Sequence, residues 1–123
     1  MEDLLHYFSH LALPVVLAWL FFRSDWKRAA LVMLLTMVVD LDHLLATPVF
    51  DPDRCSVGFH PLHNPWLFPL YIGLMFFPRG WRYAGIGLSL HMLTDFLLCV
   101  NLVHKCPSCF EGHRLEQFLN GWF

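Results

Sequence analysis

The sequence predicts an all-α membrane protein, a single domain over residues 1–123 built around about four transmembrane helices. Hydrophobic residues make up 57% of the chain and charged residues 15%, against about 45–50% and about 25% in soluble domains. The apolar residues form long runs close to the roughly 20 residues that span a bilayer. Eight histidines are present, and most lie beside these runs. Because ionisable groups are costly in a membrane, they indicate a functional site.

Each apolar run is expected to form one helix. Pro14 lies inside the first run and should kink that helix, which membrane helices tolerate. The third run begins near Pro65 and stops at Pro78. It is short for a crossing, so this helix is either tilted or re-entrant. Residues from 104 onward are expected to form an amphipathic C-terminal tail. The expected helices cover about 4–22, 26–45, 65–77 and 82–103.

The distribution of basic residues predicts the orientation of these helices. The first apolar run is expected to be retained, because acidic residues precede it where a signal peptide has basic ones. Lys and Arg concentrate in the first and third interhelical loops, at Arg23, Lys27, Arg28, Arg79 and Arg82. The positive-inside rule places these two loops in the cytoplasm. Both termini and the 46–64 loop then face outward. The polar residues of the first, second and fourth apolar runs and those of the 46–64 loop are therefore expected to meet in the outer leaflet.

Two pairs of polar residues have helical spacing. His6 and His10 lie four residues apart, as do His91 and Asp95, so each pair shares one helix face. This spacing allows both side chains of a pair to bind one metal ion. The simpler interpretations are a pair of interfacial histidines for the first and a buried hydrogen bond for the second.

A block of polar residues, Asp40-Leu41-Asp42-His43, interrupts the second run. A carboxylate in hydrocarbon costs about 2.5–3.5 kcal/mol, and no Lys or Arg lies within the apolar runs to form a salt bridge. A bound cation would offset this cost. Asp40 and His43 share a face, whereas Asp42 points elsewhere and suits a role in holding a histidine tautomer. His60 and His63 follow in the loop, either as two ligands or as a ligand and a general acid.

The cysteines allow more than one arrangement. Four cysteines are too few and too scattered for a disulfide scaffold. The C-x-x-C motif of the tail, flanked by His104 and His113, could bind zinc or form a disulfide. Cys55 and Cys99 could pair with each other or with the tail. The four are Cys55, Cys99, Cys106 and Cys109.

These motifs occur in an order that resembles a known family. His6, the 40–43 block, the two loop histidines and His91-x-x-x-Asp95 match the small bacterial inner-membrane metal-dependent hydrolases that include the LexA-regulated membrane protein. The resemblance covers about residues 4–100 and is closer to a compact, uncharacterised branch of that family. More remotely, the chain is similar to zinc-dependent phospholipase C and P1 nuclease, which are all-helical enzymes that hydrolyse phosphate esters with clustered zinc ions.

The resemblance implies a set of metal ligands and an inner-membrane location, and the basic residues place the site on the extracytoplasmic side. The wider family has four residues between its two loop histidines, whereas only Pro61 and Leu62 intervene here, so either histidine could be the ligand. Asp95 matches an aspartate that can bridge two metals. The C-terminal ligands of the soluble enzymes have no clear counterpart, although His104, Glu111, His113 and Glu116 are present. A full three-zinc centre of that kind is not expected.

The leading functional prediction is a zinc-dependent hydrolase with one or two ions, acting on a lipid or other phosphoester at the outer leaflet. The predicted metal ligands are His6, His10, Asp40, His60, His91 and Asp95. The residues predicted to handle protons are Asp42, His43 and His63. Two alternatives remain: a metal-ion or proton transporter, and a membrane scaffold with a closed structural metal site. The net charge of −2 gives no indication of a nucleic-acid partner, and homo-oligomerisation stays open.

Overall fold

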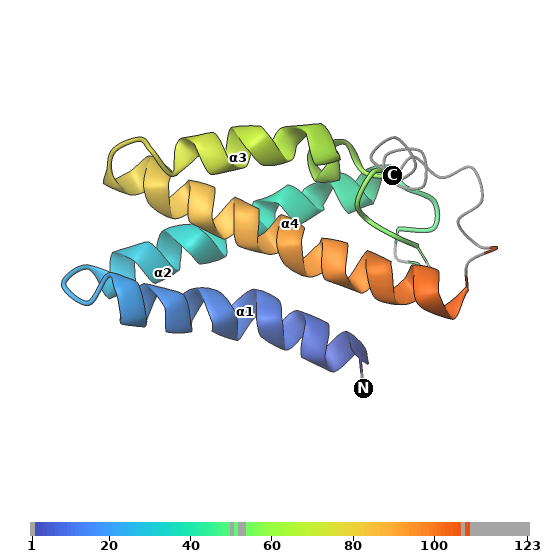
Figure 1. The fold of residues 1–123 in the computed structure, drawn as a ribbon, viewed down its shortest axis with the longest axis horizontal. Helices are drawn as coiled ribbons and strands as arrows, with labels where there is room; N and C mark the ends of the chain where they lie inside the picture. The colour runs from blue at the N-terminus through green and yellow to red at the C-terminus, as the bar shows by residue number, and fades with distance from the viewer. Residues whose placement is uncertain (1, 50, 52–53, 107, 109–123) are drawn as a thin grey trace.

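The computed structural model describes residues 2–49, 51, 54–106 and 108, and all regular elements within these ranges are helices. The prediction of an all-α chain is confirmed. The helices lie lengthwise in one elongated bundle, with α4 running through it (Figure 1). Helix α4 includes the first two residues of the predicted amphipathic tail, His104 and Lys105, and most of the rest of that tail, residues 107 and 109–123, falls outside the described residues. The elements are α1 (Glu2–Phe21), α2 (Trp26–Leu35), η1 (Thr36–Leu45), η2 (Pro61–His63), η3 (Pro65–Leu67), α3 (Phe68–Leu74) and α4 (Arg79–Lys105).

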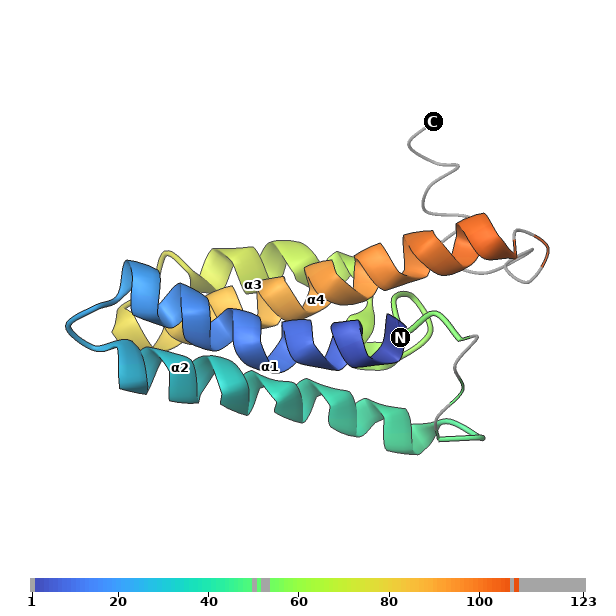
Figure 2. The same ribbon diagram turned by 90° about the horizontal axis from the view of Figure 1, so that it is seen from below.

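Helices α1 and α2 form an antiparallel hairpin (Figure 2). Their contact is built on small buried residues, Ala18 on α1 and Ala29 on α2, which allow the two backbones to approach closely. Helix α1 continues through Pro14. At the turn between α1 and α2, the hydroxyl of Tyr83 on α4 donates to Asp25 Oδ2 over 3.2 Å. The two predicted basic loops therefore lie at the same end of the bundle.

The second predicted helix changes its geometry half-way along. Residues 26–35 are α-helical, but the following ten residues form the tighter 3₁₀ helix η1. The hydroxyl of Thr36 donates to the carbonyl of Met33 at this junction, and such bonds compete with regular helix pairing. The β-branched Val38 and Val39 also disfavour the α conformation. Because residues three apart align in a 3₁₀ helix, Asp40 and His43 share one face.

The third predicted helix is shorter than the sequence indicates. A single 3₁₀ turn, η3, precedes α3, which has only seven residues. The side chain of Asn64 accepts a hydrogen bond from the Trp66 N–H over 3.1 Å and caps this start. Gly58 has a φ of 83°, which favours glycine and turns the preceding loop toward the bundle. A disulfide joins Cys55 in this loop to Cys99 on α4, one of the pairings that the sequence left open.

Helix α4 approaches its neighbours through two glycines. A Cβ at Gly85 would lie 2.8 Å from the backbone of Met75 and Tyr71, beside α3. A Cβ at Gly87 would lie 2.6 Å from the Thr36 hydroxyl and 2.9 Å from Met33 Cα. Both positions therefore have no room for a side chain.

We expect Gly87→Ala to destabilise the protein by about 1–3 kcal/mol, the typical cost of overpacking. This cost should exceed the gain of replacing a helical glycine by alanine, about 1 kcal/mol. Thermal unfolding in detergent measures the effect. Gly73→Ala is the control, because nothing lies within 4 Å of its added Cβ. Equal losses of stability in the two variants would contradict the close contact at Gly87.

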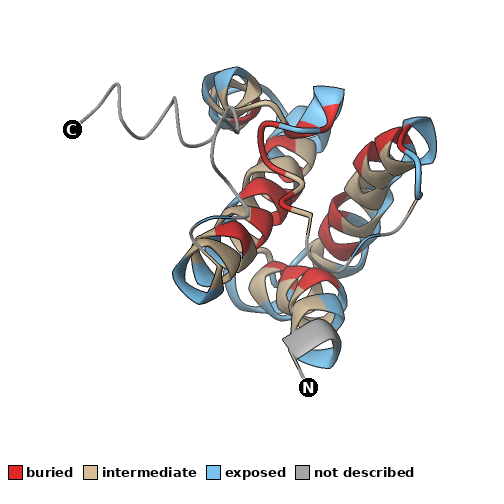
Figure 3. Ribbon diagram, turned by 90° about the vertical axis from the view of Figure 1, so that its right-hand side faces the viewer, coloured by how far each residue is buried: buried red, intermediate tan, exposed pale blue. Residues whose placement is uncertain are grey.

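Two helices are long and apolar enough to cross a membrane: Leu4–Phe21 within α1, and α4. Only 17% and 28% of the residues in their apolar windows are buried. Viewed end-on, the buried faces of the helices turn toward one another and the exposed faces turn outward (Figure 3). Those outer faces carry large apolar side chains such as Phe8, Trp19, Leu31 and Leu97.

Candidate metal centre

One part of the bundle interior is polar, although many of the side chains on the outer surface are apolar. Among the described residues, six histidine and aspartate side chains are buried: His10, Asp42, His60, His63, His91 and Asp95. Buried ionisable groups require compensation by partners or a metal ion. Together with His6, Asp40 and His43 they form three groups. Within each group, the possible ligand atoms lie within 4.8 Å of one another.

The first group collects four residues from three elements: Asp40 on η1, His63 on η2, and His91 and Asp95 on α4. His63 Nε2 and His91 Nε2 lie 3.0 Å apart. Asp40 Oδ1 lies 3.4 Å from His63 Nε2 and 3.1 Å from His91 Nε2. Asp95 Oδ2 lies 3.1 Å and 3.3 Å from the same two nitrogens.

These separations fit the corners of one tetrahedron. Zinc binds nitrogen and oxygen ligands at about 2.0–2.1 Å, and the edge of a tetrahedron of that radius is about 3.3–3.4 Å. The five separations above lie between 3.0 and 3.4 Å. The first group therefore has the ligand types and the spacing that a divalent ion requires.

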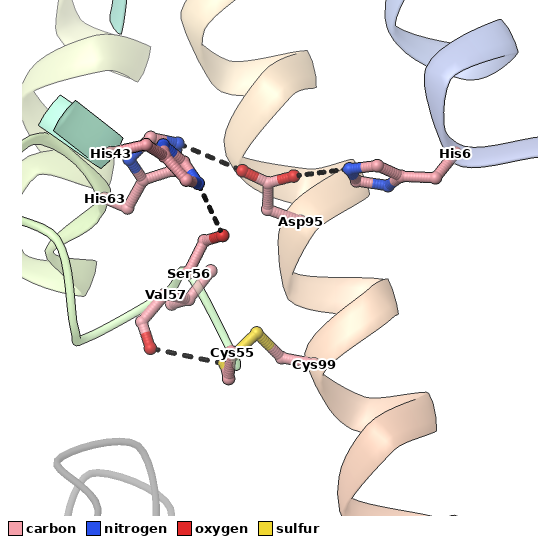
Figure 4. Close-up of a disulfide and its surroundings, with 8 residues drawn as sticks. All are labelled: His6, His43, Cys55, Ser56, Val57, His63, Asp95 and Cys99. Atoms are coloured by element: carbon pink, nitrogen blue, oxygen red, sulfur yellow. Dashed lines mark hydrogen bonds and ion pairs between the residues drawn. A yellow bond between two sulfur atoms is a disulfide. The ribbon is translucent and has the colours of Figure 1, made fainter. Parts of the chain in front are cut away.

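The second group shares Asp95 with the first. His6 Nε2 and His10 Nε2 on α1 lie 3.1 Å apart, and both face the other carboxylate oxygen, Oδ1, at 3.3 Å and 3.0 Å. Figure 4 shows Asp95 between His6 on one side and His63 on the other. Asp95 thus presents one oxygen to each group, which is the geometry of a carboxylate that bridges two ions.

Asp42 orients a histidine of the first group. Its Oδ2 lies 3.1 Å from His63 Nδ1 and accepts the Leu62 backbone N–H over 2.8 Å. With its proton on Nδ1, His63 directs the Nε2 lone pair at the other ligands, which is the usual arrangement around a metal-bound histidine. Burial alone would lower the pKa of His63, but hydrogen bonds that the surrounding carboxylates accept from its ring, Asp40 first, raise this pKa to about 10.

The third group consists of Asp42, His43 and His60. The rings of His43 and His60 stack with centroids 4.0 Å apart. Burial, followed by the neighbouring His43, lowers the pKa of His60. His43 Nδ1 lies 3.2 Å from Asp42 Oδ1, and its Nε2 lies 3.2 Å from Ser56 Oγ.

One family model, described as a family of unknown function (DUF6122), matches residues 1–102. The chain belongs to this family. No curated protein and no solved structure matches it. The matched range of the DUF6122 model contains every residue of the three groups.

The structure of this DUF6122 chain places the two loop histidines in different groups. The sequence assigned His60 to the metal and His63 to proton handling, whereas His63 joins the four-residue group and His60 joins Asp42 and His43. Asp42 lies behind His63, a position suited to orienting it. His43 faces Ser56 and Asp42.

A cavity of about 530 Å³ opens beside the groups in this DUF6122 structure. Its polar wall includes His6, Asp40 and Asp95, and apolar side chains from η1, α4 and the loop after η1 complete it. Arg54 and Ser56 also line the cavity. Sequence reasoning missed both as site residues. Their position in the loop that carries His60 and His63 was the sequence feature that could have identified them. The apolar lining residues are Met37, Val49 and Leu98.

Proposed function

We propose that this protein is a membrane-embedded, divalent-metal-dependent hydrolase with two ions bound around Asp95. The observation that carries the proposal is the carboxylate of Asp95, which presents Oδ1 to two histidines of α1 and Oδ2 to His63 and His91. When bound, such ions lower the pKa of a coordinated water and polarise a phosphoryl or acyl oxygen.

The apolar surface supports a position within the bilayer. A helix in the core of a soluble protein is mostly buried, whereas α1 and α4 bury less than a third of their apolar windows. At 1.5 Å per residue, α1 and α4 reach about 30 and 40 Å. The continuous stretch of α2 and η1 reaches about 35 Å, because a 3₁₀ helix rises about 2.0 Å per residue. All three are long enough for a hydrocarbon core of about 30 Å.

The fourth segment is better described as a partial crossing. Together η3 and α3 reach only about 17 Å and pack against α4. The loop of residues 54–64 occupies the level of the site and lines its cavity. Non-helical backbone at membrane depth is tolerated where it lines a polar cavity or is buried in protein. The short third helix thus leaves room for a site in the outward half of the bundle.

Two independent features favour an outward-facing site. The basic loops lie together at the opposite end of the bundle, joined by the contact between Tyr83 and Asp25, and basic loops stay in the cytoplasm. The Cys55–Cys99 disulfide lies at the site end, and disulfides persist in oxidising compartments outside the cytoplasm. Both observations support a bacterial inner-membrane protein whose centre opens on the extracytoplasmic side.

The cavity favours an enzyme over a closed structural metal site. A structural zinc is fully coordinated by protein, whereas a catalytic zinc keeps one position open. The second group offers three ligands, His6, His10 and Asp95, and all three line the cavity. An ion held by these three ligands would be open to substrate or water from the cavity.

The lining of the cavity supports our proposal of an anionic substrate with an apolar part. Arg54, whose guanidinium pairs with Asp51 over 3.5 Å, lies in the wall together with apolar side chains. A guanidinium matches the geometry of a phosphate oxygen pair. We therefore propose a phosphoester, with a phospholipid or lipid-linked phosphate as the leading class.

Metal removal tests this function. The full chain, purified in detergent and stripped by a chelator, should hydrolyse neither a phospholipid in mixed micelles nor a water-soluble phosphodiester. Adding Zn²⁺ should restore hydrolysis, with the phospholipid preferred if the apolar wall holds an acyl chain. If the zinc-loaded protein cleaves neither substrate, the phosphoesterase proposal is overturned.

A further inference from the structure

The third group contains buried atoms that protein partners leave unsatisfied. The side chains of Asp42 and His60 are each more than nine-tenths buried, at 4% and 3% exposed. Within the described part of the chain, Asp42 Oδ1 and His60 Nε2 have no hydrogen-bond partner. Buried polar atoms nearly always take part in a hydrogen bond, so a carboxylate oxygen and a ring nitrogen without one require an explanation.

The position of His43 suggests an explanation for these two buried atoms. Its Nδ1 lies 3.2 Å from Asp42 Oδ1, yet that oxygen accepts no hydrogen bond. A ring nitrogen and a carboxylate oxygen that lie in ion-pair contact have the spacing of two ligands of one cation. On its other side, His43 Nε2 lies 3.2 Å from the Ser56 hydroxyl. A metal-bound histidine commonly donates its second ring N–H to such a partner.

We propose that Asp42, His43 and His60 hold a further divalent cation, separate from the pair around Asp95. Each contributes one ligand atom, all within 4.8 Å. Two imidazoles and one carboxylate favour zinc or a similar transition metal over magnesium or calcium. His43, His60 and Ser56 line the same cavity as the Asp95 centre, so substrate or water can complete the coordination.

Asp42 connects the two sites. Its Oδ2 orients His63 of the Asp95 centre, while its Oδ1 faces the third group. This position differs from a centre completed by C-terminal ligands, because all three residues precede α3 in the chain. The additional ion is independent of whether the protein hydrolyses phosphoesters, since it rests on other donor atoms.

Metal counting in variants tests the proposal. The full chain in detergent is stripped, reloaded with Zn²⁺, freed of excess metal and measured by elemental mass spectrometry. His60→Gln and His43→Gln should each lose one equivalent relative to wild type and keep the others. Asp95→Asn should keep this one equivalent and lose the rest. His104→Gln, an exposed histidine outside the three groups, is the matched control and should keep all of them.

Two results would overturn the additional site. One is a wild-type metal count in the His60 and His43 variants. The other is loss of all zinc from His60→Gln while the variant keeps the wild-type melting temperature in the stripped state. Loss of hydrolysis alone would leave the metal counts unchanged, so failure of the proposed function and failure of this site remain distinguishable.

Discussion

Asp95→Asn should abolish metal binding at the proposed two-ion centre. Asparagine keeps the shape of the side chain but removes the charge that faces four histidine nitrogens at 3.0–3.3 Å. Loss of a residue that only hydrogen-bonds a metal ligand typically lowers the metal affinity 10–100-fold. Loss of a ligand shared by two ions should therefore lower the affinity at least about 100-fold. The protein should lose two zinc equivalents, and phosphoester hydrolysis should fall to the rate of the stripped wild type.

Thermal unfolding gives a second measure of the same effect. A ligand that binds only the folded state stabilises it by about 2.7 kcal/mol at 100 times its dissociation constant. Added zinc should therefore raise the melting temperature of the wild type much more than that of Asp95→Asn. Asp25→Asn is the matched control, because Asp25 lies at the opposite end of the bundle beside Tyr83. Full zinc content in Asp95→Asn would contradict the assignment of the centre.

Replacing both Cys55 and Cys99 by serine should produce the largest loss of stability. The disulfide closes a loop of 44 residues, and the chain-entropy relation gives about 4 kcal/mol for a loop of this size. The tether also holds the 54–64 loop, with His60 and His63, against the helix that carries His91 and Asp95. We therefore expect a lower melting temperature together with weaker zinc binding.

Reduction of the wild type separates the disulfide from the serine substitutions themselves. A reductant should lower the melting temperature of the wild type toward that of the double variant and leave the double variant unchanged. An unaltered wild-type melting temperature under reducing conditions, with the bond shown to be broken, would mean that the disulfide does not support the fold. Zinc content measured in the same samples shows whether the tether positions the loop ligands.

The way the helices pack explains how so short a chain can place many histidine and aspartate residues in its interior. In a soluble domain, apolar burial drives packing and polar groups face water. Here much of the apolar surface faces outward, and close contacts at Gly85, Gly87 and the alanines of the α1–α2 hairpin bring the helices together. The space inside is then available for histidine and aspartate, whose mutual contacts join α1, η1, η2 and α4.

Apolar run length and residue spacing were sufficient to predict part of this architecture from the sequence. Apolar run length predicts the helices from 4 to 22 and from 82 to 103 within a few residues of α1 and α4, because a helix needs only its own backbone bonds. Four-residue spacing places His6 beside His10 and His91 beside Asp95 on single helix faces. The same rules could not reveal the 3₁₀ geometry of η1 or the seven-residue length of α3, which depend on side-chain hydrogen bonds and packing.

The sequence by itself therefore determined an all-helical, apolar chain with an inventory of histidine and aspartate residues at helical spacing. Only the tertiary structure decided that Cys55 pairs with Cys99, that His63 joins Asp40, His91 and Asp95 while His60 joins Asp42 and His43, and that Asp95 faces two groups at once. The reason is physical. Periodicity reports which residues share a helix face, whereas the path of a loop depends on contacts between segments that are distant in the chain.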